Sequence, residues 1–220
     1  MDRITYDNFL FDFKSMVVEW FEHDNILPSG GLECLHFHKV YNLFERENDQ
    51  STIWHKCFYN KIRKDVRFDH EYTSFLSQYI KPRFGEEIVY QKIPTFRVHL
   101  PGNIAVGEYH KDKYYRNVEW AEKVGETNYY LPLTKAYGTN TIWAETEEDK
   151  SDFKPFDSDY GECIEWNASN LTHGNNDNIT NATRVSFDFR VIPKSRYIES
   201  SHLTINTGIP FGIGGYYEEL

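Results

Sequence analysis

The spacing of apolar residues changes near residue 85. Before that point, apolar residues recur every three or four positions, which is the period of one face of a helix. Three stretches have this spacing: Phe9, Leu10, Phe13, Met16, Val17, Trp20 and Phe21; Ile53, Trp54, Cys57 and Phe58; and Phe68, Tyr72, Phe75, Leu76, Tyr79 and Ile80. We therefore expect residues 1–84 to be mostly helical.

After residue 85 the chain consists of short apolar runs separated by turn residues, a pattern typical of β-strands. The runs are "EIVYQ", "TFRVHL", "NIAVGEYH", "TNYYLPLT", "TNTIWAE", "GECIEWN" and "TRVSFDFRVI". Their number and spacing predict a mainly β fold, a sandwich or barrel-like jelly roll, with the helices flanking it.

No linker separates these elements, so we expect a single domain over residues 1–220. Residues 1–84 would form its helical part, 85–195 its β core and 196–220 a C-terminal tail. The tail contains "TGIPFGIGGYY", whose glycines would allow either a lid that moves on a hinge or an ordered extension.

Composition narrows the class of protein. Aromatic residues make up 17% of the 220 residues, which excludes disorder on compositional grounds. The formal charge is −10, with no basic run, so we expect no nucleic-acid partner and allow a cationic one. The acidic N-terminus does not resemble a signal peptide, and no apolar stretch is long enough for a membrane span. We therefore expect a cytoplasmic protein with no membrane partner. We also expect its three cysteines to be reduced, buried thiols.

The segment "AVGEYHKDKYY" ends a predicted strand with His110 and Asp112. Residues two apart on a strand share a face, so both side chains can point into the mouth of a barrel beside Glu108. Alone, the pair is weak evidence, because a polar strand end has the same appearance.

A second polar group lies in "NLTHGNNDNITNATRVSFDFRVI", where His173 precedes a turn rich in Gly and Asn. The strand that follows alternates Arg184, Ser186, Asp188 and Arg190 with Val185, Phe187, Phe189 and Val191. We expect the apolar face to pack against the helices and the polar face to point into the barrel, where polar groups must be paired or bind something polar. An interior Arg with a Ser two residues later suits a ligand carboxylate.

Together these residues predict a metal centre. Two imidazoles and one carboxylate, from His110, Asp112 and His173, leave open positions on Fe(II) for a co-substrate and dioxygen. Arg184 with Ser186 would hold the far carboxylate of 2-oxoglutarate.

The chain resembles the Fe(II)/2-oxoglutarate-dependent dioxygenases, and among them the StrG-like family known from streptomycin biosynthesis. The resemblance lies in "RVHLPGNIAVGEYHKDKYY", "NYYLPLTKAYGTNTIWAET" and "LTHGNNDNITNATRVSFDFRVIP", and extends weakly into "GIGGYY". It implies a double-stranded β-helix core of the jelly-roll or cupin-like type, Fe(II) at His110, Asp112 and His173, and 2-oxoglutarate at Arg184. It also implies O2-dependent conversion of 2-oxoglutarate to succinate and CO2, with hydroxylation as the default outcome.

Other polar residues have two interpretations each. Asn128, on one face with Tyr130, would bond a carboxylate of 2-oxoglutarate or serve as a cross-strand structural amide. Trp143, with Thr141, would line the pocket or belong to the core. Arg97 and His99 would bind substrate, or pair with Glu108 or Asp188. The pair His36 and His38 has no third ligand nearby, so we do not expect a metal there.

The predicted substrate is a small polar metabolite, because the expected interior carries charged groups (Arg97, His99, Glu108 and Asp188). The setting of the family in aminoglycoside pathways favours an amino sugar or an aminocyclitol, with an amino acid as the competitor. Two other classes use the same barrel. A metal-binding cupin-like isomerase or epimerase would not consume O2, and a sugar-binding jelly roll would need no metal.

Overall fold

The computed structural model describes residues 1–40, 51–105, 108–115, 117–200, 203 and 208–220. Its helices are α1 (Phe13–His23), α2 (Ile53–Ile62), α3 (Val66–Phe75), α4 (Lys81–Phe84) and α5 (Val118–Val124), with short 3-10 or π turns η1 (Leu32–Phe37), η4 (Leu76–Ile80), η5 (Asp112–Tyr115), η6 (Gly138–Asn140) and η7 (Lys194–Arg196). Its strands are β1 (Asp2–Thr5), β2 (Ile88–Gln91), β3 (Thr95–His99), β4 (Thr127–Pro132), β5 (Ile142–Ala144), β6 (Lys154–Pro155), β7 (Glu162–Trp166), β8 (His173–Asn175), β9 (Arg184–Pro193) and β10 (Tyr217–Glu219).

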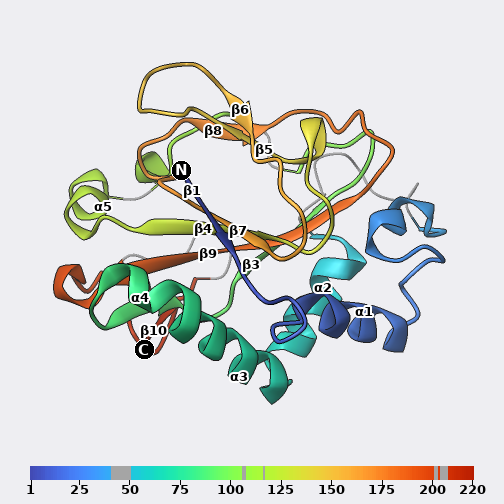
Figure 1. The fold of residues 1–220 in the computed structure, drawn as a ribbon, viewed down its shortest axis with the longest axis horizontal. Coiled ribbons are helices and arrows are strands. Elements are labelled where there is room, and N and C mark those ends of the chain that lie inside the picture. Colours follow the sequence, from blue (N-terminus) through green and yellow to red (C-terminus); the bar gives the residue numbers. More distant parts are fainter. Residues whose placement is uncertain (41–50, 106–107, 116, 201–202, 204–207) are drawn as a thin grey trace.

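Two antiparallel sheets form the core. The large sheet has the order β1-β7-β4-β9-β2-β10, with β3 also paired to β9, and the small sheet has the order β6-β5-β8. An isolated bridge between His110 and His173 extends the small sheet by one short segment. In Figure 1 the small sheet lies on one side of the large sheet and the N-terminal helices lie on the other. The strands β3, β9, β4 and β7 of the large sheet face the small sheet of β5, β6 and β8. This is the topology of a double-stranded β-helix, so the predicted fold class is confirmed.

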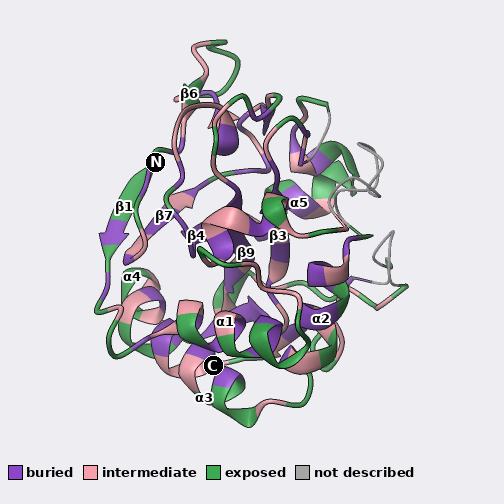
Figure 2. Cartoon of the chain, turned by 90° about the vertical axis from the view of Figure 1, so that its right-hand side faces the viewer, coloured by how far each residue is buried: buried purple, intermediate pink, exposed green. Residues whose placement is uncertain are grey.

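The apolar face of β9 packs against the helices, as its alternation predicts. The ring of Phe187 lies 5.4 Å from that of Phe13 in α1, and the ring of Phe189 lies 5.5 Å from that of Tyr72 in α3. All four side chains are almost completely buried, and Figure 2 shows β4 and β9, in the middle of the large sheet, as mostly buried. Fully burying a side chain of this size contributes about 1.5–3 kcal/mol to folding. The helices therefore fix the outer face of β9 and leave its polar face toward the small sheet.

The first helix begins later than its apolar spacing predicts. The Asp12 carboxylate accepts a hydrogen bond from the backbone N–H of Ser15 (3.1 Å) and caps the helix, so α1 starts at Phe13. Phe9 and Leu10, which the spacing places on the buried face, are 94% and 60% exposed. The third predicted helix changes to a π turn at Leu76. None of the helices in the described ranges is long and apolar enough to cross a membrane.

The strands β1 and β10 and the helix α5 have no counterpart among the predicted elements. β1 pairs with β7, and β10 pairs with β2. Asn117 caps the start of α5, and Gly125 caps its end. Gly125 has φ of +60°, the left-handed region in which glycine carries no Cβ penalty. The predicted run 103–110 includes residues 106–107, which lie outside the described residues, and its described part contributes only the bridge at His110. Residues 201–202 and 204–207 of the predicted tail also lie outside the described residues, whereas its end is the ordered strand β10.

The three cysteines carry free thiols. Cys57 and Cys163 are buried as predicted. Cys34 is only half-buried, which corrects that part of the expectation.

Candidate metal centre

His110 and His173 are brought together by backbone pairing. The N–H of each residue donates to the carbonyl of the other at 2.9 Å, so the two segments run antiparallel for one bridge. Directly paired residues of an antiparallel bridge carry their side chains on the same face. The two imidazole centroids lie 4.4 Å apart.

The two imidazoles have matching orientations. Nδ1 of His110 lies 2.8 Å from the carbonyl of Glu108, and Nδ1 of His173 lies 3.0 Å from the carbonyl of Leu171. A carbonyl only accepts, so each Nδ1 must carry a proton, and in the neutral ring each Nε2 then presents a lone pair. Two Nε2 atoms in this tautomer are the form of histidine that ligates a metal.

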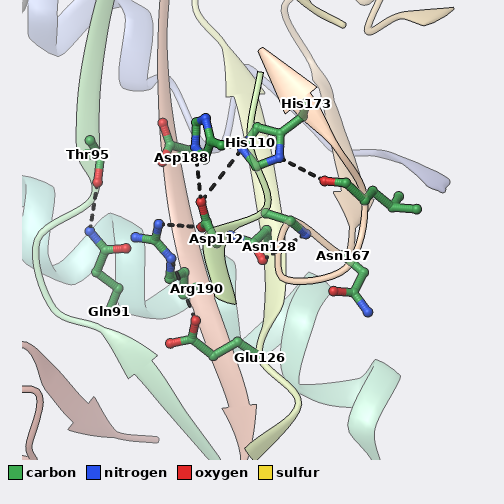
Figure 3. A network of polar contacts seen from close by, with 12 residues as sticks. Gln91, Thr95, His110, Asp112, Glu126, Asn128, Asn167, His173, Asp188 and Arg190 are labelled. Atoms are coloured by element: carbon green, nitrogen blue, oxygen red, sulfur yellow. Dashed lines mark hydrogen bonds and ion pairs between the residues drawn. The ribbon is translucent and has the colours of Figure 1, made fainter. Parts of the chain in front are cut away.

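Asp112 completes the group from the start of η5, where its N–H donates to the carbonyl of Ala168 at 2.9 Å. Its Oδ1 lies 3.5 Å from Nε2 of His110 and 3.6 Å from Nε2 of His173. One ligand atom from each of the three residues lies within 4.8 Å of the others. Figure 3 shows the carboxylate of Asp112 between the imidazoles and Arg190. Two imidazole nitrogens and one carboxylate oxygen match the donor set that binds Fe(II) with open positions.

The charges around this group favour an ionised carboxylate. Burial alone would raise the pKa of Asp112, but the charge of Arg190 and the two nearby imidazoles hold that pKa well below its usual range. Burial lowers the pKa of His173. Burial acts in the same direction on His110 and is the largest single effect there, but the hydrogen bonds to Asp112 and to the carbonyl of Glu108, with the charge of Asp112, together outweigh it and raise the pKa of His110. A metal ion at this position would displace the proton from His110.

The three groups line a cavity together with Arg97, Asn128, Ile142, Arg184, Asp188 and Arg190, among others. Arg184 is 1% exposed and comes from the start of β9. Its Nη1 donates to the hydroxyl of Ser186 at 2.9 Å, and its Nε donates to the carbonyl of Asn140 at 3.0 Å. The structure thus brings the predicted Arg and Ser together, on the wall of the cavity that also contains the metal-ligating atoms.

Asn128 lines the cavity and also serves the fold. Its Oδ1 accepts from the N–H of Ala168 at 3.3 Å, and the carbonyl of Ala168 in turn accepts from Asp112. The amide therefore supports the segment at Ala168 to which the backbone of Asp112 is bonded, which is a structural role. Its role toward 2-oxoglutarate stays a prediction. Arg97 also lines the cavity and donates from Nε to Asp188 at 3.2 Å, one of the pairings predicted for it.

Three predicted substrate residues lie elsewhere. His99 is fully buried, with its ring nitrogens 3.0 Å from the carbonyls of Asn140 and Asn103. The side chain of Glu108 is exposed, and its contribution to the centre is the backbone carbonyl that orients His110. Trp143 follows Ile142 on β5, and successive residues of a strand face opposite sides. Because Ile142 faces the cavity, Trp143 points outward and donates from Nε1 to the carbonyl of Gly138 at 2.8 Å.

In the part of the chain that the structure describes, one group of at least three His, Cys, Asp or Glu residues could hold a metal, and it consists of His110, Asp112 and His173. His36 instead contacts the hydroxyl of Thr183 through Nδ1 at 2.9 Å.

The sequence interpretation missed two features around Asp112. The neighbouring side chains of Lys111 and Lys113 are only 8% and 11% exposed, and both reach Glu148, at 3.2 and 3.0 Å. On the other side, Nη2 of Arg190 donates to Oδ2 of Asp112 at 2.8 Å. The alternation of β9 placed Arg190 on the correct face, but nothing in the sequence indicated its partner.

No protein-family profile matches the chain. The streptomycin biosynthesis protein StrG of Streptomyces griseus is 39% identical to it over 176 residues, which cover 79% of each chain. Among solved structures, it is similar to the non-heme monooxygenase ThoJ in a Ni complex (TM-score 0.47, 12% identity, covering 94% of this chain and 82% of ThoJ). It is also similar to the carbocyclase SnoK from nogalamycin biosynthesis (TM-score 0.49, 8% identity, 99% and 90%) and to EctD from S. alaskensis (TM-score 0.49, 14% identity, 96% and 76%). The structural likenesses are too distant to carry an argument about function.

Proposed function

The chain belongs to the family of the streptomycin biosynthesis protein StrG, and from that premise we propose that it is a non-haem Fe(II)/2-oxoglutarate-dependent oxygenase acting on a small polar metabolite. The observation that carries the proposal is the cluster of His110, Asp112 and His173 in one cavity with Arg184. A metal-binding group explains the first three residues, and a carboxylate-bearing co-substrate explains why a buried arginine faces them.

In this proposal each residue has a defined task. His110 and His173 offer Nε2, and Asp112 offers Oδ1, so that the protein holds the metal from one side and leaves the side toward the cavity open. Arg184 and Ser186 bind the far carboxylate of 2-oxoglutarate and set its direction. Iron with 2-oxoglutarate and O2 would supply the oxidising chemistry. The walls of the cavity exclude water from it.

The substrate class follows from what faces the cavity and from the relative. Asp188, Arg97 and Asn175 add polar groups to the lining, which suits a molecule with several hydrogen-bonding substituents. StrG carries the name of a streptomycin biosynthesis protein, which favours an amino sugar or aminocyclitol over an amino acid. Hydroxylation is the proposed outcome.

The test is consumption of O2 and formation of succinate by purified protein supplied with Fe(II) and 2-oxoglutarate. Polar metabolites would then be screened for those that increase turnover. His173→Ala should abolish turnover and leave the fold intact, whereas His36→Ala, which removes a histidine outside the centre, should change nothing. Metal binding without O2 consumption would indicate an isomerase or epimerase. Activity retained in His173→Ala would refute the assignment.

A further inference from the structure

The two oxygens of the Asp112 carboxylate have different partners. Oδ1 faces the two imidazole nitrogens at 3.5 and 3.6 Å, and Oδ2 accepts from Nη2 of Arg190 at 2.8 Å. The side chains of Asp112 and Arg190 are only 12% and 16% exposed, so water competes little for this contact. The carboxylate is thus fixed in rotation as well as in position.

Arg190 is itself held from two further directions. Its Nη1 donates to the hydroxyl of Tyr216 at 2.6 Å, and its Nε lies 3.7 Å from a carboxylate oxygen of Glu126. The hydroxyl of Tyr217 donates to the other oxygen of Glu126. Figure 3 shows Arg190 between Asp112 and Glu126. The two tyrosines belong to the C-terminal end of the chain, where β10 pairs with β2.

We propose that Arg190, held by Tyr216 and Glu126, is a positioning residue that keeps Asp112 a one-oxygen ligand. A carboxylate can bind a metal through one oxygen or through both. With Oδ2 engaged by the guanidinium, only Oδ1 is available, so a six-coordinate ion held by three protein atoms would keep three positions for other ligands. A chelating 2-oxo acid would need two of these, and O2 would need one. If both oxygens bound, one of these positions would be lost.

The proposal rests on the metal site proposed above and assigns a role to the C-terminal end of the chain. Tyr216 anchors the guanidinium from that end, so the terminal segment belongs to the support of the centre and does more than cover the large sheet. For the tail, the sequence allowed a moving lid or an ordered extension, and this proposal takes the tail as an ordered extension.

The experiment uses the full-length protein loaded with Co(II) without O2, because the visible spectrum of Co(II) reports its coordination. Arg190→Met is compared with wild type for bound metal per chain, for the spectrum, and for the Kd of 2-oxoglutarate. We expect one metal per chain in both and a changed spectrum in the variant. The affinity for 2-oxoglutarate should fall about 10- to 100-fold, the size of the loss in metal affinity or activity that follows removal of an outer partner of a metal ligand. Arg190→Lys keeps the charge but cannot reach all three partners, so it should restore the affinity only in part.

Two matched controls separate this role from general stability. Arg83 also pairs with two carboxylates, those of Asp2 and Glu165, but none of these three residues lines the cavity, so Arg83→Met should leave spectrum and affinity unchanged. Tyr216→Phe should shift both in the same direction as Arg190→Met, by a smaller amount. Tyr90→Phe removes a hydroxyl that contacts Glu218 at 3.3 Å on the same sheet edge and should have no effect.

Each outcome decides one of the two proposals. An Arg190→Met protein with the wild-type spectrum and the wild-type Kd overturns the role of Arg190 and leaves the metal site intact. A wild-type protein that binds no Co(II) removes the proposed function and this inference with it. If Arg190→Met does not fold, Arg190→Lys and Tyr216→Phe carry the test, and wild-type behaviour in both refutes it.

Discussion

Replacing Arg184 by Met tests whether the cavity binds a 2-oxo dicarboxylate. Arg184 is 1% exposed, and its donors to Ser186 and Asn140 direct the guanidinium along the cavity wall. Met is of similar length and keeps the apolar part of the packing, but it removes the charge. The expected result is weaker binding of 2-oxoglutarate with metal binding unchanged, because Arg184 touches none of the three metal-ligating side chains in the contacts described above.

The magnitude follows from burial. Truncating one partner of a buried, hydrogen-bonded charge pair costs about 2–5 kcal/mol. At about 1.4 kcal/mol for each tenfold change, the KM for 2-oxoglutarate should rise about 30-fold to several thousand-fold. Ser186→Ala removes a single hydrogen bond worth about 0.5–1.5 kcal/mol, so its KM should rise about 2- to 12-fold.

The assay measures succinate against 2-oxoglutarate concentration, with metal content determined separately. Arg97→Met is the matched control, because Arg97 lines the same cavity but pairs with Asp188 at 3.2 Å. The Arg97→Met variant should show a larger change in turnover of the metabolite substrate than in the KM for 2-oxoglutarate. The reasoning is refuted if Arg184→Met keeps the wild-type KM, and a large KM increase in Arg97→Met would transfer the role to that residue.

Three further predictions concern the product, the core and the response to pH. In excess chloride, mass spectrometry should find hydroxylated and no chlorinated products, because Asp112 fills the position that a halide would need; a chlorinated product would contradict this. Phe187→Ala should lower the free energy of unfolding in urea by about 3–5 kcal/mol, since the ring is fully buried against α1. Phe9→Ala, at a 94% exposed position, should change it by less than about 0.5 kcal/mol; equal effects would show that the burial argument is wrong. Burial, with the nearby charge of Asp12, raises the pKa of Glu71 from 4.5 to about 7. The folded state therefore binds more protons than the unfolded state in that window, and wild type should lose stability as pH rises through it. Glu71→Gln should remove about 1 kcal/mol of that loss, after allowance for partial exposure, and parallel stability curves against pH would contradict this.

The sequence was sufficient for the features that depend on local periodicity. The alternation along β9 predicted both faces of that strand, and the structure confirms that Phe187 and Phe189 pack against the helices. The residues of the candidate metal centre could be grouped from the sequence because two of them, His110 and Asp112, are close in sequence. His173 could be joined to them only because the hypothesis of a barrel brings distant strand ends together.

The features that escaped prediction depend on contacts between distant segments. β1 pairs with β7 from the opposite end of the chain, and no local signal specifies that partner. The sequence left Trp143 between the pocket and the core, because a shift of one residue in the phase of a strand reverses every side chain. The contact between Arg190 and Asp112 depends on the register of β9 and on the loop after His110, neither of which the periodicity fixes.

The arrangement of charge in the cavity connects the proposed ligand set to the fold. By formal charge, Arg97, Arg184 and Arg190 bring three positive charges to the lining of the cavity, and Asp112 and Asp188 bring two negative ones. Glu126, which lies behind the lining at 3.7 Å from Arg190, supplies the third negative charge. Buried charges are costly unless they are balanced, and this set balances before any ligand enters. A divalent metal with dianionic 2-oxoglutarate adds no net charge, whereas either one alone would leave two charges uncompensated in a buried site. The protein should therefore bind each of them more tightly in the presence of the other, which couples the metal at Asp112 to the carboxylate at Arg184 without requiring a change in the fold.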